Sequence, residues 1–363
     1  MSEVTEVRGD PEAIDAAWLT SVLEAGGIAR GARLDDVRVG DHIGTGQMGR
    51  NVRFHLTWDE PDGRPETLVA KFPTTEPVVR ANGFGNGTYI KEYVFYDQLQ
   101  PTVDVRTPRS YAAVWDDDVP DFVLLMEDMA GSAQGDQFDG LTPDQAALVV
   151  EQAVALHAPR WGDDSLTTLL GRSSEETAEL LTALYTGTLE GSLLRLDEWL
   201  DQEDIDLARE LTPLVGRWSL GRDTPSTLVH MDFRPDNFLF GVTPDAPPLA
   251  VVDWQTISYA NGTNDLAYAI GGGFEPEQRA EVERDLVVDY CDRLRVAGID
   301  YSFDDCWRDY CQNSVWGVVM SVIATMLAEE TERGNAMLAT MLRRAARHAI
   351  DLDALALLED DDR

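Results

Sequence analysis

Lysine is nearly absent from this sequence of 363 residues, in which only Lys71 and Lys91 occur. The 29 basic residues are opposed by 66 acidic ones, and the formal net charge is −37. A chain with a field of this sign repels nucleic acids and anionic membranes, so we expect neither as a partner. The charge indicates a surface of solvated carboxylates, as in salt-adapted proteins, before it indicates attraction of a cationic substrate.

Cysteines and long apolar runs are scarce as well. Cys291, Cys306 and Cys311 are odd in number and lack CxxC spacing, which favours a reducing compartment over a disulfide framework. No apolar run reaches the roughly 18 residues that a membrane span needs. The first residues also lack the basic and apolar segments of a signal peptide. We therefore expect a cytoplasmic protein whose length allows about two domains or lobes.

The first part of the chain has strand-like patterns. The stretch NVRFHLTW alternates between apolar and polar residues, the turn DEPDGRPE follows, and TLVAKFP returns, so we expect an antiparallel hairpin over residues 51–72. Residues 11–25 and 89–99 have helical spacing, and residues 121–129 begin as a short buried strand. Residues 1–129 are therefore expected to form a small lobe built on an antiparallel sheet.

Helical patterns dominate after Gly131. Helices are expected at 142–158, 173–187, 192–200, 203–218, 275–297, 303–330 and 335–357. Short strands are expected at 227–229, 238–240 and 249–252. We therefore predict an α+β fold, in which the small β-sheet lobe is joined to a larger, mainly helical lobe (130–363) near the stretch GSAQG.

Several features of the first lobe suit the binding of phosphate groups. Gly44, Gly46 and Gly49 form a GxGxxG pattern before a strand rather than before a helix, which argues against a Rossmann dinucleotide site. The backbone of a Gly-rich hairpin tip can approach phosphates because no Cβ blocks it. Lys71, on the returning strand, supplies a point charge for two phosphate groups. Glu92 lies on the inward face of the next predicted helix, where a carboxylate needs a partner, and Lys71 is the obvious one.

The most informative stretch is LVHMDFRPDNFLF at residues 228–240. Asp232 is a candidate base for the proton of an attacking hydroxyl, and Asn237 offers an amide oxygen to a hard cation such as Mg²⁺. Arg234 lies between them and suits bidentate contact with a transferring phosphate. We expect His230 to be structural and to hold the turn through packing and hydrogen bonds.

Two further acids follow. Asp253 ends the apolar strand LAVVD and is a second candidate ligand for Mg²⁺, which is commonly held by one or two carboxylates together with substrate phosphates. Asp265, in GTNDLAY, is either an ordinary acid at a helix start or a residue with a special role. The Gly-rich hairpin, strand Lys, helix Glu, Asp-x4-Asn loop and strand-end Asp follow the order of the parts that transfer a phosphoryl group from ATP.

On these residues the chain resembles the protein-kinase-like superfamily, and within it the aminoglycoside phosphotransferase and choline kinase branch. HMDFRPDN is similar to the H-x-D-x-x-x-x-N motif of that branch, and VVDWQTISYANGTNDLAY is similar to its segment around a metal-binding Asp. KEYVFYDQL resembles the glutamate helix of small-molecule kinases related to ecdysteroid kinases. The resemblance runs from about Val39 to Leu266. One departure is Met231, where the branch usually carries glycine.

The resemblance implies a bilobal protein-kinase-like fold and transfer of the γ-phosphate of ATP, with Mg²⁺, to a hydroxyl of a small molecule. It makes Asp232 the catalytic base and places Arg234 near the γ-phosphate. It makes Asn237 and Asp253 the metal ligands.

The resemblance also implies a nucleotide site in the first lobe. Lys71, paired with Glu92, would hold the α- and β-phosphates beneath the Gly-rich hairpin. The backbone of Glu127 and Met129, after the apolar run LLM, would contact the edge of the adenine base.

Two other functions and the identity of the acceptor stay open at this point. A protein kinase needs a long segment after the metal-binding Asp to dock a peptide, but only a short one separates Asp253 from Asp265. A nucleotide-binding pseudokinase usually lacks the base, a metal ligand or the lysine, and this chain keeps all three. Aminoglycosides, amino alcohols, sterols and related hydroxyl compounds are all possible acceptors. Aromatic and acidic residues at 301–316 suit a cationic acceptor, although aromatics at helical spacing more often form core.

Overall fold

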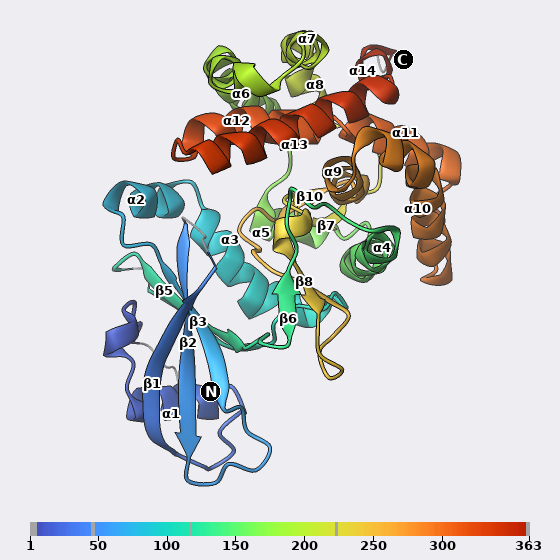
Figure 1. Cartoon of the computed structure of the whole chain (residues 1–363). Helices are drawn as coiled ribbons and strands as arrows, with labels where there is room; N and C mark the ends of the chain where they lie inside the picture. The colour runs from blue at the N-terminus through green and yellow to red at the C-terminus, as the bar shows by residue number, and fades with distance from the viewer. Residues whose placement is uncertain (1–5, 45–47, 117, 222–223, 361–363) are drawn as a thin grey trace.

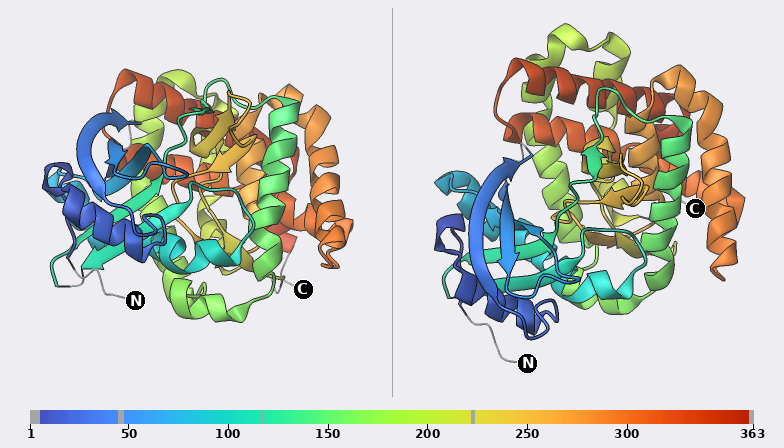
Figure 2. Two further views of the ribbon diagram at one scale, coloured as in Figure 1. Left: turned by 90° about the horizontal axis from the view of Figure 1, so that it is seen from below. Right: turned by 60° about the horizontal axis from the view of Figure 1, so that its bottom comes forward.

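The computed structural model describes residues 6–44, 48–116, 118–221 and 224–360, and it has two lobes (Figures 1 and 2). The N-terminal lobe contains one antiparallel sheet of five strands in the order β1-β2-β3-β5-β4. The strands are β1 (Leu34–Ile43), β2 (Gly49–Trp58), β3 (Thr67–Pro73), β4 (Ser110–Asp116) and β5 (Asp121–Glu127). The predicted α+β class and the predicted small antiparallel lobe are both confirmed.

The sheet is covered on both faces because successive side chains of a strand point to opposite sides. Val123 and Leu125 of β5 pack with helix α1 (Ala16–Ala25), whereas Phe122 and Leu124 pack with helix α3 (Thr88–Val94). A π-helical turn (Phe95–Leu99) continues α3, and helix α2 (Pro77–Gly85) precedes it. The predicted helix at 89–99 therefore changes its winding at Phe95.

The C-terminal lobe is a set of helices around two small sheets (Figure 1). The helices are α4 (Pro143–His157), α5 (Thr167–Leu170), α6 (Glu175–Leu196), α7 (Gln202–Glu210), α8 (Val215–Leu220), α9 (Thr263–Gly273), α10 (Pro276–Val296), α11 (Phe303–Asn313), α12 (Trp316–Leu327), α13 (Glu332–Asp351) and α14 (Ala354–Asp360). The strands are β6 (Ser132–Gln134), β7 (Thr227–Val229), β8 (Phe238–Gly241), β9 (Leu249–Val251) and β10 (Ser258–Ala260). They pair in the orders β6-β8-β9 and β10-β7.

Some element boundaries differ from the sequence prediction. The expected helices at 303–330 and 335–357 are each broken in two. The second break follows Asp351 and contains Asp353, which has a φ of 54°. The two helices expected between 173 and 200 are largely one, α6. Strand β1 was not predicted because most of its residues are exposed or half-buried, so it lacks the apolar alternation of a strand with one buried face.

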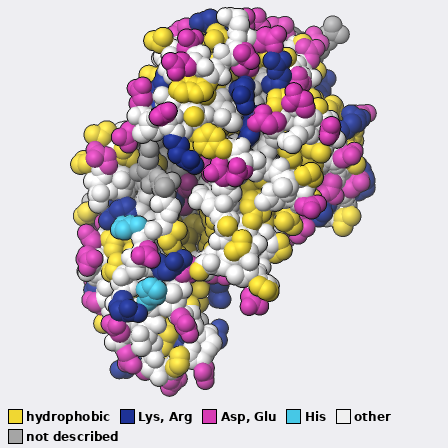
Figure 3. Space-filling view, in the orientation of Figure 1, with side chains coloured by type: hydrophobic (Ala, Val, Ile, Leu, Met, Phe, Trp, Pro, Cys, Tyr) yellow, Lys and Arg dark blue, Asp and Glu magenta, His cyan; other side chains and the backbone are white. Residues whose placement is uncertain are grey.

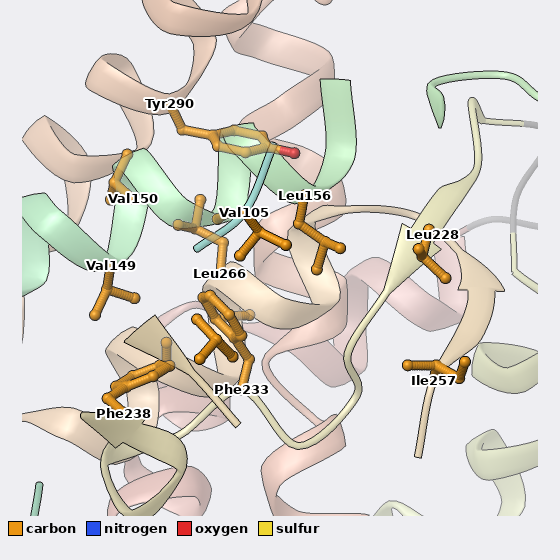
Figure 4. Packing of buried hydrophobic residues seen from close by; sticks show 14 of the residues in the cluster. Val105, Val149, Val150, Leu156, Leu228, Phe233, Phe238, Ile257, Leu266 and Tyr290 are labelled. Carbon is orange, nitrogen blue, oxygen red and sulfur yellow. The ribbon is translucent and has the colours of Figure 1, made fainter. Parts of the chain in front are cut away.

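One hydrophobic core joins the lobes. It contains Phe95 beyond α3, Phe122 of β5, and the residues of the C-terminal lobe that Figure 4 labels. The division into residues 1–129 and 130–363 remains a prediction. It is supported by the end of β5 at Glu127 and by the pairing of β6 with β8 in the second lobe. Within the described ranges, no helix is long and apolar enough to cross a lipid bilayer.

Candidate active site

The stretch that carries Asp232 is a loop between two buried strands. β7 ends at Val229, a short 3-10 turn covers Pro235–Asn237, and β8 begins at Phe238. Phe233 and Phe238 are fully buried and meet edge to face at 4.9 Å between ring centroids, which can be followed in Figure 4. The apolar residues of the stretch therefore fix the loop in the core and leave its polar residues at the boundary between the lobes.

The polar side chains of this loop contact one another. Arg234 donates from Nε to Asp232 Oδ1 at 3.0 Å, and Asn237 donates from Nδ2 to Asp232 Oδ2 at 2.8 Å. Arg234 also pairs with Asp236. Burial opposes the charge of Arg234, but the carboxylates of Asp232 and Asp236 outweigh it and raise its pKa, so Arg234 remains a cation. Because Asn237 uses its nitrogen on Asp232, its amide oxygen is left for a cation.

Side chains from three other segments hold the backbone of the loop. Asp265, which is fully buried in α9, accepts from the N–H groups of His230 and Met231 at 2.7 and 2.8 Å. Trp316 donates from Nε1 to the Met231 carbonyl at 2.8 Å. Thr256 donates to the His230 carbonyl at 2.7 Å. Asp265 therefore has a structural role in the site, which the sequence left undecided.

His230 behaves as predicted. It is fully buried, its Nε2 lies 3.0 Å from the Val252 carbonyl, and its Nδ1 accepts from the N–H of Asp232 at 3.2 Å. Met231 has a φ of 67°, in the left-handed region that favours glycine. The bonds from Asp265 and Trp316 hold it in this conformation.

Lys71, Glu92 and Asp253 form a second cluster. The Lys71 Nζ lies 2.8 and 2.7 Å from the two Glu92 oxygens and 3.0 Å from Asp253 Oδ1. The side chains of Lys71 and Glu92 are 9% and 2% exposed, whereas that of Asp253 is 33% exposed and can meet a ligand. The predicted pairing of Lys71 with Glu92 is confirmed, and Asp253 joins it.

The charges of this cluster are coupled. Burial disfavours the charge on Lys71, but the carboxylates of Asp253 and Glu92 outweigh it and raise the pKa of Lys71. Burial would raise the pKa of Asp253, but the Lys71 ammonium outweighs it and lowers that pKa. Burial, together with the nearby Asp253 carboxylate, raises the pKa of Glu92. One cation shared by two carboxylates leaves an excess of negative charge that suits a divalent cation.

The two clusters are neighbours. The residue before Asp253, Val252, donates its N–H to the Asn237 carbonyl at 3.0 Å. Asn237 and Asp253 are therefore brought to one place, as predicted for a pair of magnesium ligands. Among the described residues, no group of three or more His, Cys, Asp or Glu side chains could hold a metal. A site with one Asp and one Asn fits Mg²⁺, which takes its other ligands from water and substrate phosphates.

The Gly-rich hairpin leads directly to this cluster. Gly44 has a φ of 75°, and Gly46 lies outside the described residues. Gly49 begins β2, and a Cβ built on it would lie 2.9 Å from Cε of Lys71. A side chain at position 49 would therefore displace the end of the Lys71 side chain from this position. Figure 3 shows the surface hollowed between the two lobes, with acidic side chains spread over the visible face.

The segment after β5 has backbone groups with defined partners. Glu127 donates its N–H to the Arg109 carbonyl at 2.9 Å, so a contact with a nucleotide would have to use its carbonyl. The Met129 carbonyl accepts from Ser132 N–H at 2.9 Å, so Met129 would have to use its N–H. Between them, Asp128 makes a bidentate pair with Arg53 of β2 at 2.6 and 2.9 Å. This pair ties the segment to the sheet.

Sequence reasoning missed or misplaced some residues. Tyr268 of α9 is buried, and its pKa is raised by burial and by the nearby Asp232 carboxylate. Of the aromatic residues at 301–316, Trp316 bonds to the loop that carries Asp232, whereas others lie away from it. Tyr301 and Tyr310 are core, and Arg284 lies over the ring of Trp307 at 5.2 Å. No periodic signal in the sequence distinguishes Tyr268 from an ordinary core tyrosine, because its neighbours in α9 are buried too.

The chain belongs to the phosphotransferase enzyme family, whose model matches residues 49–299. That range contains both clusters and the loop that carries Asp232. No curated protein matches the sequence.

Solved structures of kinases share the fold. A putative aminoglycoside phosphotransferase from Ralstonia eutropha JMP134 is 18% identical, with 94% of this chain and 98% of that chain covered and a TM-score of 0.51. An ethanolamine kinase from Plasmodium vivax is 11% identical, with 96% and 90% covered and a TM-score of 0.50. An ADP-bound aminoglycoside phosphotransferase, APH(2'')-Ib, is 16% identical, with 91% and 98% covered and a TM-score of 0.47. At these identities the first two similarities show a common fold, and the predicted protein-kinase-like architecture is confirmed.

Proposed function

We propose that this phosphotransferase is a small-molecule kinase that transfers the γ-phosphate of ATP, with Mg²⁺, to a hydroxyl group. The observation that supports this most is the meeting of two clusters from distant parts of the chain. One cluster contains the candidate base Asp232, and the other contains the Lys71 ammonium and the Asp253 carboxylate. Either cluster by itself could be an ordinary structural ion pair. Phosphoryl transfer needs both, because a nucleophile and a phosphate donor must be brought together.

Asp232 is proposed to accept the proton of the acceptor hydroxyl. In the free protein its two oxygens are held by Arg234 and Asn237, which fix the orientation of the carboxylate. Arg234 is then close enough to contact the transferring phosphate and stabilise its developing charge. Mg²⁺, held by Asn237 and Asp253, would neutralise charge on the phosphates.

The nucleotide is proposed to bind between the Gly-rich hairpin and the segment after β5. Lys71, which is held by Glu92, would contact the α- and β-phosphates. Adenine presents an N–H donor beside a ring-nitrogen acceptor, and the carbonyl of Glu127 and the N–H of Met129 are the complementary pair. Cytoplasmic ATP is the expected donor.

Two alternatives are less well supported. A protein kinase would need a peptide-docking segment between Asp253 and α9, but there the chain forms strand β10, which pairs with β7. A pseudokinase would be expected to have lost part of the phosphate or metal site. Lys71, Glu92, Asn237 and Asp253 are all present in bonded positions.

The acceptor is proposed to be an aminoglycoside, an amino alcohol, a sterol or a related hydroxyl compound. The acidic surface favours a cationic acceptor over an anionic one. The aromatic residues at 301–316 no longer support this preference, because they are core or covered by Arg284.

The test uses the wild-type protein, the Asp232→Asn variant and the Glu190→Gln variant. Glu190 is a matched control because it is an exposed acid that pairs with Arg209 on the helical lobe. Each protein is incubated with Mg-ATP and a pooled library of hydroxylated amines, sugars and sterols, and products are detected by mass spectrometry as the gain of one phosphoryl group. The proposal predicts a product with wild type and E190Q, and a rate lower by on the order of 10³-fold with D232N.

Two outcomes would contradict the proposal. Equal product from D232N and wild type would remove Asp232 from the chemistry. Failure of the wild-type protein to bind Mg-ATP would exclude the kinase and the pseudokinase together. Tight binding of Mg-ATP without any product across a broad library would favour the pseudokinase.

A further inference from the structure

Helix α3 contacts three parts of the proposed nucleotide site through one face. Tyr89, Glu92 and Phe95 lie three residues apart, so their side chains share that face. Glu92 holds Lys71, and the ring of Phe95 stacks on Trp254 at 3.7 Å, next to Asp253. The third contact is made by Tyr89.

The Tyr89 hydroxyl lies where the Gly-rich hairpin joins the sheet. It donates to the carbonyl of Met48 and accepts from the N–H of Thr74 at 3.4 Å. Met48 directly precedes Gly49, which begins β2 and pairs with Pro73 of the neighbouring strand β3. The hydroxyl therefore bonds to the β2 side of the Gly-rich hairpin, at Met48, and to the residue that follows β3, at Thr74.

The ring of Tyr89 has little freedom to move. It is 1% exposed and packs against Phe84 and Phe122 at centroid distances of 4.8 and 5.1 Å. A Cβ built on Gly83 would come within 2.5 Å of the ring, so α2 approaches it as closely as a side chain allows. Burial raises the pKa of the hydroxyl, which stays protonated and able to donate at neutral pH.

We propose that Tyr89 is a positioning residue for phosphate binding: its hydroxyl fixes the base of the Gly-rich hairpin to the same helix whose Glu92 fixes Lys71. Hairpin and lysine are then held relative to each other by one rigid element, and both act on the phosphates. This inference rests on the proposed ATP site and adds a residue that contacts neither ATP nor acceptor. Its effect is expected on the phosphate end of the nucleotide and not on the base.

The test compares Tyr89→Phe with Tyr185→Phe. The first variant keeps the packed ring and removes only the hydroxyl. The second removes a hydroxyl of the same kind, because Tyr185 is fully buried in α6 and donates to the carbonyl of Ala208 at 2.7 Å, in the helical lobe. Each variant loses the bond that a buried hydroxyl donates to a carbonyl, and Y89F also loses the longer bond from the Thr74 N–H, so Y185F controls for the loss of stability that follows from the donated bond.

Binding of Mg-ATP and of adenosine to each full-length protein is measured by calorimetry. We expect Y89F to bind Mg-ATP about three- to tenfold more weakly, the range that one hydrogen bond supplies. Binding of adenosine by Y89F, and of either ligand by Y185F, is expected to be unchanged. In turnover assays with an acceptor, the KM for ATP is expected to rise more than kcat falls.

The outcomes separate this inference from the proposed function. If wild type and Y89F bind Mg-ATP with equal affinity, the role of Tyr89 is overturned and the proposed kinase function is left intact. Equal weakening of ATP and adenosine by Y89F would also overturn it, because that pattern indicates a disturbed lobe rather than a displaced hairpin. A wild-type protein that does not bind Mg-ATP would overturn the proposed function itself.

Discussion

The two loops that meet at the site are held in different ways. The loop that carries Asp232 is bonded by side chains from α9, from α12 and from the segment after Asp253, and its phenylalanines lie in the core. The described end of the Gly-rich hairpin, at Met48, is held by the Tyr89 hydroxyl and the N–H of Thr74. The catalytic end of the site is therefore built into the helical lobe, whereas the described part of the hairpin at Met48 is held by bonds at its base. Changes to the first should cost stability and activity together, and changes to the second mainly affinity.

The largest effect is expected for Asp265→Ala. The change leaves the N–H groups of His230 and Met231 without a partner inside the core. We expect the free energy of unfolding to fall by about 3–5 kcal/mol and kcat to fall by on the order of 10²-fold, measured by urea denaturation and by turnover. Asp265→Asn, which keeps one acceptor oxygen, should lie between. The exposed Asp300→Ala is the control, and a D265A protein as stable as the control would contradict the comparison.

A pH-dependent effect is expected for Lys71→Met. The free energy of unfolding should fall by roughly 2–3 kcal/mol because the buried carboxylates lose their cation. The loss is limited because the raised pKa of Glu92 allows that carboxyl to take up a proton. The folded state raises the pKa of Lys71 above its ordinary 10.5, so the stabilisation by its charge is fully present below pH 10.5 and declines as the pH rises toward the folded value.

Chemical denaturation of wild type and K71M between pH 8 and 12 measures this difference. We expect the difference in free energy of unfolding between wild type and K71M to be constant up to about pH 10 and to become smaller above it. A gap that widens at alkaline pH would show that Lys71 is destabilised as a cation in the folded protein, and the cluster with Glu92 and Asp253 would have to be wrong.

Gly49→Ala should change affinity more than stability. The added Cβ meets Cε of Lys71 at 2.9 Å and the Phe72 carbonyl at 3.2 Å, and the flexible lysine side chain can give way. We expect Mg-ATP to bind about tenfold more weakly because the ammonium group is displaced. The free energy of unfolding should change by less than about 1 kcal/mol. Gly187→Ala, on α6 with open space around it, is the control. Unchanged affinity in G49A would mean that Lys71 does not hold the phosphates.

The smallest effect is expected for Met231→Gly. Glycine relieves about 1–2 kcal/mol of strain at a φ of 67°, and loss of the half-buried side chain costs a similar amount, so stability should change by less than about 1 kcal/mol. Met231→Val, with a β-branched side chain at the same φ, should be clearly less stable than either. If denaturation curves show that M231V is as stable as wild type, Asp265 and Trp316 do not hold the left-handed conformation at this position.

The sequence predicted the parts of the site better than the connections between them. HMDFRPDN and LVAK could be interpreted locally, because a base, an amide and a lysine have a chemistry of their own at that spacing. Asp265, Trp316 and Tyr89 could not, because their function depends on which backbone groups they meet. Trp316 and Met231 are far apart in the chain, and only the packing of helices α6, α8, α12 and α13, in which Trp316 is buried, brings them together.

The fold followed the same division. The hairpin β2–β3 and helices such as α4 and α10 were predicted because their apolar periodicity records burial on one face. No apolar periodicity predicts the exposed strand β1, the π-helical turn after α3 or the breaks within 303–357, because tertiary contacts decide them. By itself the sequence therefore determined the α+β class, the antiparallel sheet in the first part of the chain and the chemical groups that are candidates for the site. Only the tertiary structure decided which of these groups meet, because hydrogen bonds between distant segments form only after the core has packed them together.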